Sequence, residues 1–209
     1  MKRIVIVGCA GSGKSTLAHR LGQHLGLPVV HLDVLFWRPG WKAGDTAEFR
    51  DRVAVAMAGD TWISEGNFVD ETFDLRLPRA DTIVILERSR WICLLRVIWR
   101  AIFHRQRPDL PAGCPESPDE ELLSYIWNFG RITRPHMEAA LLPYLRDKHV
   151  IRLRRGREIA ALLAPSDSGR HHRPWRAPAG AARSGRQFPP NDTSAAARSS
   201  AKLPPRVWL

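Results

Sequence analysis

The sequence has few cysteines, and their placement excludes a disulfide scaffold. Cys9, Cys93 and Cys114 are odd in number and widely spaced among 209 residues. That pattern is typical neither of a disulfide framework nor of a Cys/His metal site. It indicates a reducing compartment, and we therefore expect a cytoplasmic protein.

A long apolar segment is also missing. The most apolar stretch, 91–103, is interrupted by Arg96 and Arg100, and it is shorter than the roughly 20 residues that span a bilayer. The first residues are basic, but only 4–7 are apolar before Gly8, which is too few for the apolar region of a signal peptide. We expect no contact with a membrane.

Acidic residues are scarce, with 21 Asp and Glu against 32 Lys and Arg, so the net charge is +11. The excess is uneven, because residues 165–209 contribute 8 basic and only 2 acidic side chains. That segment is rich in Pro, Ala and Ser and has no apolar period, which predicts a disordered basic tail after one domain at 1–164. Such a tail favours at most weak, nonspecific contact with nucleic acid.

Short apolar runs alternate with helical patterns along 1–164. The runs lie at 4–7, 28–32, 61–64, 82–86 and 149–153, and the helical patterns at 15–25, 46–58, 90–104, 119–128, 136–147 and 157–163. This alternation predicts an α/β fold, a three-layer sandwich in which a five-stranded parallel sheet has helices on both faces. Residues 105–118 are rich in proline and predict a loop, which together with the preceding helix end forms a candidate lid at about 96–118.

The strongest motif follows the first apolar run directly. Residues 8–16 read GCAGSGKST, a full P-loop pattern between a strand and a helix. Its glycines let backbone N–H groups surround an anion, Lys14 can reach the β- and γ-phosphates, and the Ser15 hydroxyl is placed to hold Mg²⁺. We therefore predict an ATP site made by Gly8, Gly11, Ser12, Gly13, Lys14, Ser15 and Thr16.

Carboxylates at two other strand ends are candidates for the phosphoryl acceptor. No apolar run ends in the Asp-Glu pair of a motor-type ATPase, but Asp33 ends the second run and Glu65 the third. Asp33 could orient an acceptor hydroxyl or belong to the Mg²⁺ shell, the alternative being a helix cap or a loop carboxylate. Glu65 could bind the acceptor or lie in the outer shell of the metal, or it could be a buried structural glutamate paired to an arginine.

Arginines near the predicted lid could neutralise the transferring phosphoryl group. Arg96 and Arg100 are four residues apart on one helix face, and Arg88 and Arg90 follow the fourth run, where they could serve the acceptor. The alternative is that Arg96 and Arg100 are a solvated face of an amphipathic helix. The opposite face would then pack Trp91, Leu94, Leu95, Ile98 and Ile102.

Several segments in series resemble one family. They are GCAGSGKST at 8–16, HLDVLFWRPGW at 31–41, WISEGNF at 62–68 and RADTIVILERSRW at 79–91, followed by the helix with Arg96 and Arg100. Over about 1–164 the chain resembles the adenylate-kinase-related P-loop proteins named DNA topology modulation proteins. The resemblance implies the sheet order 2-3-1-4-5, ATP binding at the P-loop and Asp33 near the acceptor. One departure is Ser89, where the resemblance implies a proline before Arg90.

Two functions remain open on the sequence. One is an ATP- and Mg²⁺-dependent kinase for a nucleoside, nucleotide or other small metabolite. The other is an ATP-binding regulatory protein associated with DNA topology, which the family name implies, although the chain carries no recognisable nucleic-acid-binding motif. The oligomeric state is left open.

Overall fold

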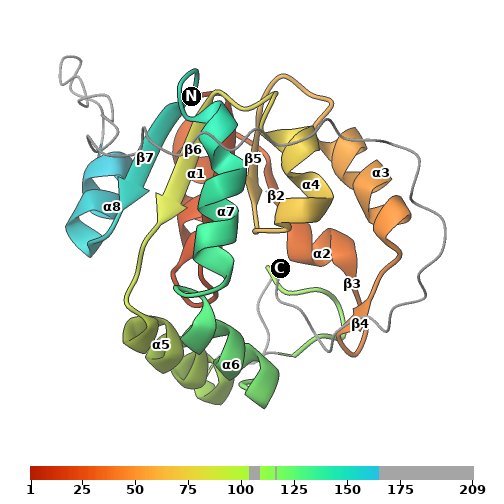
Figure 1. Ribbon diagram of the computed structural model, residues 1–209, viewed down its shortest axis with the longest axis vertical. Helices are drawn as coiled ribbons and strands as arrows, with labels where there is room; N and C mark the ends of the chain where they lie inside the picture. The colour runs from red at the N-terminus through yellow and green to blue at the C-terminus, as the bar shows by residue number, and fades with distance from the viewer. Residues whose placement is uncertain (104–108, 116, 165–209) are drawn as a thin grey trace, which may run out of the picture.

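The computed structural model describes residues 1–103, 109–115 and 117–164. The predicted tail, 165–209, lies outside these residues. Figure 1 shows a central sheet with helices in front of it and behind it, and a pair of helices below the ends of the strands. Within the described part, no helix is both long and apolar enough to cross a bilayer.

The sheet is parallel and five-stranded, as predicted, and its order is β2-β5-β1-β6-β7. Numbered along the chain, these strands have the order 2-3-1-4-5 that the family resemblance implies. The bounds are β1 Arg3–Gly8, β2 Val29–His31, β5 Trp62–Glu65, β6 Thr82–Leu86 and β7 His149–Leu153. The central strand β1 pairs with β5 and β6, so its carboxyl end lies in the middle of the sheet edge.

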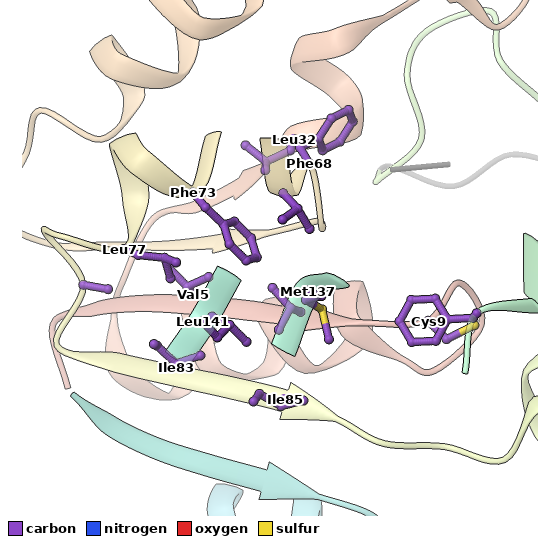
Figure 2. Packing of buried hydrophobic residues seen from close by; sticks show 14 of the residues in the cluster. Val5, Cys9, Leu32, Phe68, Phe73, Leu77, Ile83, Ile85, Met137 and Leu141 are labelled. Carbon is purple, nitrogen blue, oxygen red and sulfur yellow. The ribbon is translucent and has the colours of Figure 1, made fainter. Parts of the chain in front are cut away.

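Alternate residues of β1 pack into two separate apolar layers. Ile4 and Ile6 belong to the layer on one face, together with apolar residues of α1 (Lys14–Leu25) and α8 (Gly156–Leu163). Val5 and Val7 belong to the larger layer on the other face, part of which Figure 2 shows. Because all four side chains are fully buried, the unbroken apolar run is explained by helices on both faces.

The helices of the larger layer are α3 (Thr46–Ala56), α4 (Val69–Arg76) and α7 (Thr133–Leu141), which is followed by a 3₁₀ turn at Leu142–Tyr144. The pattern at 46–58 predicts α3 closely, whereas the pattern at 136–147 begins three residues after the start of α7 and ends three residues beyond the 3₁₀ turn. The sequence analysis did not find α4, nor the short α2 (Leu32–Phe36) and the hairpin β3 (Trp37–Arg38) and β4 (Lys42–Ala43). These elements are too short for a clear period, and packing of Phe36 against Phe49 and Phe68 stabilises them.

A pair of helices lies beyond the carboxyl edge of the sheet. α5 (Arg90–Phe103) and α6 (Glu120–Asn128) pack on each other and form the lower layer in Figure 1. α5 buries Cys93, Val97 and Ala101. The packing considered for its other face is wrong, because Trp91, Leu95, Ile98 and Ile102 are exposed.

Candidate active site

The P-loop connects β1 to α1 through a turn that only small residues can make. Gly11 and Gly13 have φ angles of 75° and 101°, in the left-handed region that favours glycine. A Cβ on Gly13 would have the Arg96 guanidinium as its nearest neighbour, at 3.5 Å, so it is the backbone conformation at Gly13 rather than a lack of space that favours glycine there. Lys14 Nζ donates a hydrogen bond to the Cys9 carbonyl at 3.2 Å, which curls the lysine over the loop.

Helix α5 supports the outside of this loop. A Cβ on Gly11 would lie 2.5 Å from the Cys93 carbonyl oxygen, so the two backbones are in direct contact. Arg96 Nη1 donates to the Ser12 carbonyl at 3.2 Å. The hydrogen bond with Cys93, together with burial, raises the pKa of the Cys9 thiol. Cys9 is therefore a small neutral packing residue of the loop, whereas the same contact lowers the pKa of Cys93.

The two predicted carboxylates, Asp33 and Glu65, lie close enough to each other and to Lys14 for their charges to interact. Burial, followed by the charge of Glu65, raises the pKa of Asp33 to about 6, against the opposing effect of Lys14. Burial alone would raise the pKa of Glu65, but the hydrogen bond from His31 and the charge of Lys14 outweigh it and lower that pKa. Asp33 is therefore the more basic carboxylate of the pair.

His31 and Glu65 form a close pair across neighbouring strands. They are register partners in β2 and β5, and His31 Nδ1 lies 2.7 Å from Glu65 Oε1. Burial alone would lower the pKa of His31, but the hydrogen bond and the charge of Glu65 raise it. The partner of Glu65 is thus a histidine, not the arginine that the structural alternative required.

The other oxygen of Glu65 suggests where a divalent cation fits. Glu65 Oε2 is buried and has no hydrogen-bond partner among the described residues, while Ser15 lies close enough to lower the pKa of the carboxyl. The described residues contain no cluster of three His, Cys, Asp or Glu side chains that could hold a metal. A Mg²⁺ ion that takes one or two protein oxygens and completes its shell with water and phosphate needs no such cluster.

A buried asparagine fastens the start of the P-loop. Asn67 Oδ1 accepts from the Gly8 N–H at 3.0 Å, and its Nδ2 donates to the Gly8 carbonyl at 3.1 Å and to the Tyr125 hydroxyl at 2.8 Å. Behind Asn67, the fully buried Arg76 donates to the Gly66 and Asn67 carbonyls. Burial lowers the pKa of Arg76 to about 9. These bonds hold the segment after β5 against the phosphate loop.

The wall opposite the P-loop is built from two connected segments. The Gly40 N–H donates to the Gly113 carbonyl at 2.9 Å, and Trp41 Nε1 donates to the Pro115 carbonyl at 3.0 Å. The hairpin and part of the predicted lid are therefore hydrogen-bonded together. Trp41 has a φ of 56°, a conformation that costs energy for a bulky residue and that presents its ring to the pocket.

One pocket joins the phosphate loop to this wall. Of the predicted site residues, the pocket brings together Gly11, Lys14, Ser15, Asp33, Glu65 and Arg100. Trp37 lines the pocket as well, and the lining residues that sequence reasoning missed include Trp41, Asn67, Phe68, Leu110, Ser117, Leu122 and Tyr125. The only sequence signal for several of these residues was their position near Asp33, Glu65 or the proline-rich loop.

The remaining predicted residues lie around the pocket without lining it. Thr16 is exposed on α1, and Arg96 contacts the P-loop from outside. Arg88 donates to the Arg154 carbonyl, and Arg90 lies over the ring of Trp127 at 4.3 Å. Neither Arg88 nor Arg90 is brought to the acceptor side of the pocket.

The fold places the protein in a class of known structures. No protein-family model and no curated protein matches the chain. Among solved structures, the chain is similar to shikimate kinase from Acinetobacter baumannii in complex with shikimate, with 16% identity, a TM-score of 0.50 and coverage of 78% of this chain and 89% of that one. It is also similar to a gluconokinase from Sinorhizobium meliloti, with 16% identity, a TM-score of 0.44 and coverage of 78% and 91%.

The likeness to shikimate kinase shows that the chain has a P-loop kinase-like fold. The more specific resemblance to DNA topology modulation proteins stays a prediction, and so does the contact with nucleic acid through residues 165–209.

Proposed function

We propose that the protein is an ATP- and Mg²⁺-dependent phosphotransferase that acts on a small molecule with a hydroxyl group. The observation that carries the proposal is that Lys14 of the P-loop and Asp33 line the same pocket, and that the pKa of the Asp33 carboxyl is raised to about 6. A kinase reaction requires an anion cradle and a general base in the same cavity.

The nucleotide side of the reaction rests on residues 8–16. The inward-facing backbone N–H groups of the loop and the N-terminus of α1 would bind the phosphates, and Lys14 would neutralise charge on the transferring group. Ser15 and the unpartnered oxygen of Glu65 would hold Mg²⁺, directly or through water, with Asp33 nearby. When bound, Mg²⁺ supplies positive charge that stabilises the phosphate oxygens.

The acceptor side rests on Asp33 and Arg100. The ionised Asp33 carboxylate accepts the proton of the acceptor hydroxyl as that oxygen forms a bond to the γ-phosphorus, and the bond from this phosphorus to ADP breaks. With a pKa of about 6, Asp33 is mostly ionised at neutral pH and still basic enough to take the proton. Arg100 lines the same pocket and adds positive charge where the phosphoryl oxygens develop negative charge.

The test is a screen for phosphoryl transfer. The full chain is incubated with Mg²⁺ and γ-labelled ATP, together with panels of nucleosides, nucleotides, hydroxylated acids and sugars, and labelled products are separated from ATP and phosphate. We expect at least one labelled acceptor, and the signal should disappear in Lys14→Ala. A protein that binds ATP but labels no acceptor in any panel would contradict the proposal.

A further inference from the structure

Helix α5 exposes an apolar stripe that the active site does not use. Trp91, Leu95, Ile98 and Ile102 are 59%, 68%, 41% and 63% exposed. Their spacing of four, three and four residues is that of the a and d positions of a heptad, which form the seam between two packed helices. Ile92 and Phe103 border the stripe and are exposed as well. The charged residues of α5 are all basic, namely Arg90, Arg96 and Arg100. None of them lies in the stripe.

The stripe continues onto α6. The Trp91 and Trp127 rings meet edge to face with centroids 5.2 Å apart, and an apolar groove between the two helices is lined by Leu94, Leu123 and Trp127. If each exposed apolar side chain of α5 and α6 contributes the surface typical of a large side chain, scaled by its exposed fraction, together they offer roughly 800 Å². This is about the surface area that one partner buries in a stable interface. A typical monomer exposes a smaller patch.

We propose that the α5–α6 face is the interface of a homodimer, in which the α5 helices of two copies pack antiparallel across a twofold axis. An isologous pair places the stripe of each copy on itself, so Trp91 of one copy meets Ile102 of the other, and Leu95 meets Ile98. In this arrangement the apolar side chains of each stripe pack into the spaces between the side chains of the other. A single exposed stripe leaves those spaces to solvent.

Charge favours a second copy of the chain over a lipid surface as the occupant of this face. Antiparallel pairing brings Arg90 at the start of one α5 toward the end of the other, where α6 begins at the exposed Glu120. A lipid surface with negative charge would meet Glu120 beside the groove, while Arg96 and Arg100 are turned toward the P-loop and the pocket.

The test is the sedimentation of the full chain over a wide range of concentrations. We expect a dimer for the wild type and a monomer for Leu95→Glu, with the dimer dissociation constant raised at least about 100-fold. The matched control is Val55→Glu on α3, which also replaces an exposed apolar residue, 77% exposed, and should stay dimeric. Far-ultraviolet circular dichroism of both variants should match the wild type, since both positions are exposed.

A charge swap tests the orientation. Arg90→Glu should weaken the dimer, and adding Glu120→Arg should restore it; failure of that rescue would overturn the antiparallel arrangement. A wild type that is monomeric at every concentration, or a dimer that Leu95→Glu leaves intact, would overturn the proposal as a whole. So would a monomer that sediments with vesicles of phosphatidylserine and phosphatidylcholine through this face.

Discussion

The two sides of the pocket are built in different ways. In the proposed function, the phosphate side is one continuous segment, 8–16, whose backbone groups and Lys14 would bind the phosphates. The rest of the pocket is assembled from segments far apart in the chain, which contribute Asp33, Arg100 and Tyr125 among others. A binding site made by one continuous backbone segment can be recognised from the sequence. A site made by side chains from distant segments depends on how those segments pack. Function should therefore respond differently to substitutions on the two sides.

Replacing Lys14 should have the largest effect. Lys14→Ala removes the cation of the phosphate side, so we expect kcat/KM to fall at least about 10³-fold. The measurement is the steady-state rate of ADP formation with the acceptor found by the screen. Arg79→Gln is the control, because Arg79 donates to the Ala58 and Gly59 carbonyls, which lie before β5 at the end of the sheet away from the P-loop. This variant should leave the rate unchanged. Full activity in Lys14→Ala would place the phosphate site elsewhere.

Asp33→Asn should lower kcat by about 10²- to 10³-fold while ATP binding changes little, because the base is lost and the cradle stays. The raised pKa also has a pH signature. Below about pH 6, protonation of Asp33 should lower kcat/KM about tenfold for each pH unit. The acid limb of the profile should be absent in Asp33→Asn. A wild-type rate that is flat from pH 7 to pH 5 would exclude Asp33 as the base.

Asn67→Ala tests the junction between the two sides. It leaves the buried N–H of Gly8 without its acceptor, so we expect the free energy of unfolding to fall by about 1–3 kcal/mol. Urea denaturation followed by fluorescence measures it. Asn128→Ala is the control, since Asn128 donates within its own helix to Ser124 and should cost much less. Equal losses in the two variants would mean that Asn67 is not a clamp.

Arg100→Gln should have the smallest effect, a decrease of about tenfold to 100-fold in kcat/KM. Arg100 lines the pocket from α5, but Lys14 remains to neutralise the same charge. The effect should appear mainly in kcat if Arg100 acts on the transferring group, and mainly in the acceptor KM if it binds the acceptor. No change in either constant would remove Arg100 from the site.

Much of the fold was predictable, because the deciding signals are local. The buried run at 4–7, the glycines of the P-loop and the periods of α1 and α3 each lie within one window of sequence. The face of α5 was not predictable in this way. Trp91, Leu95 and Ile98 are as apolar as the buried Cys93 and Val97, so composition cannot tell which side of the helix is buried.

Within the site, Asp33 and Glu65 could be found because each ends an apolar run. Arg76 could not, because a charged side chain is rarely buried, and its bonds to Gly66 and Asn67 depend on α4, which has no clear period. Trp41 and Tyr125 also gave no signal of their own. Their place in the pocket depends on contacts between distant segments: the Trp41 bond to Pro115 spans 74 positions, and the Asn67 bond to Tyr125 spans 58.

The clamp at Asn67 has a consequence for hydrogen exchange. The Gly8 amide is protected by a side chain from beyond β5, and that side chain is held in turn by Tyr125 of α6. This amide can exchange with solvent only when the contact between those distant segments opens. Its exchange rate therefore reports the opening of the pocket itself, whereas the amides of Ile4 to Ile6 report the opening of the sheet. A ligand that closes the pocket should slow the first rate before it changes the second.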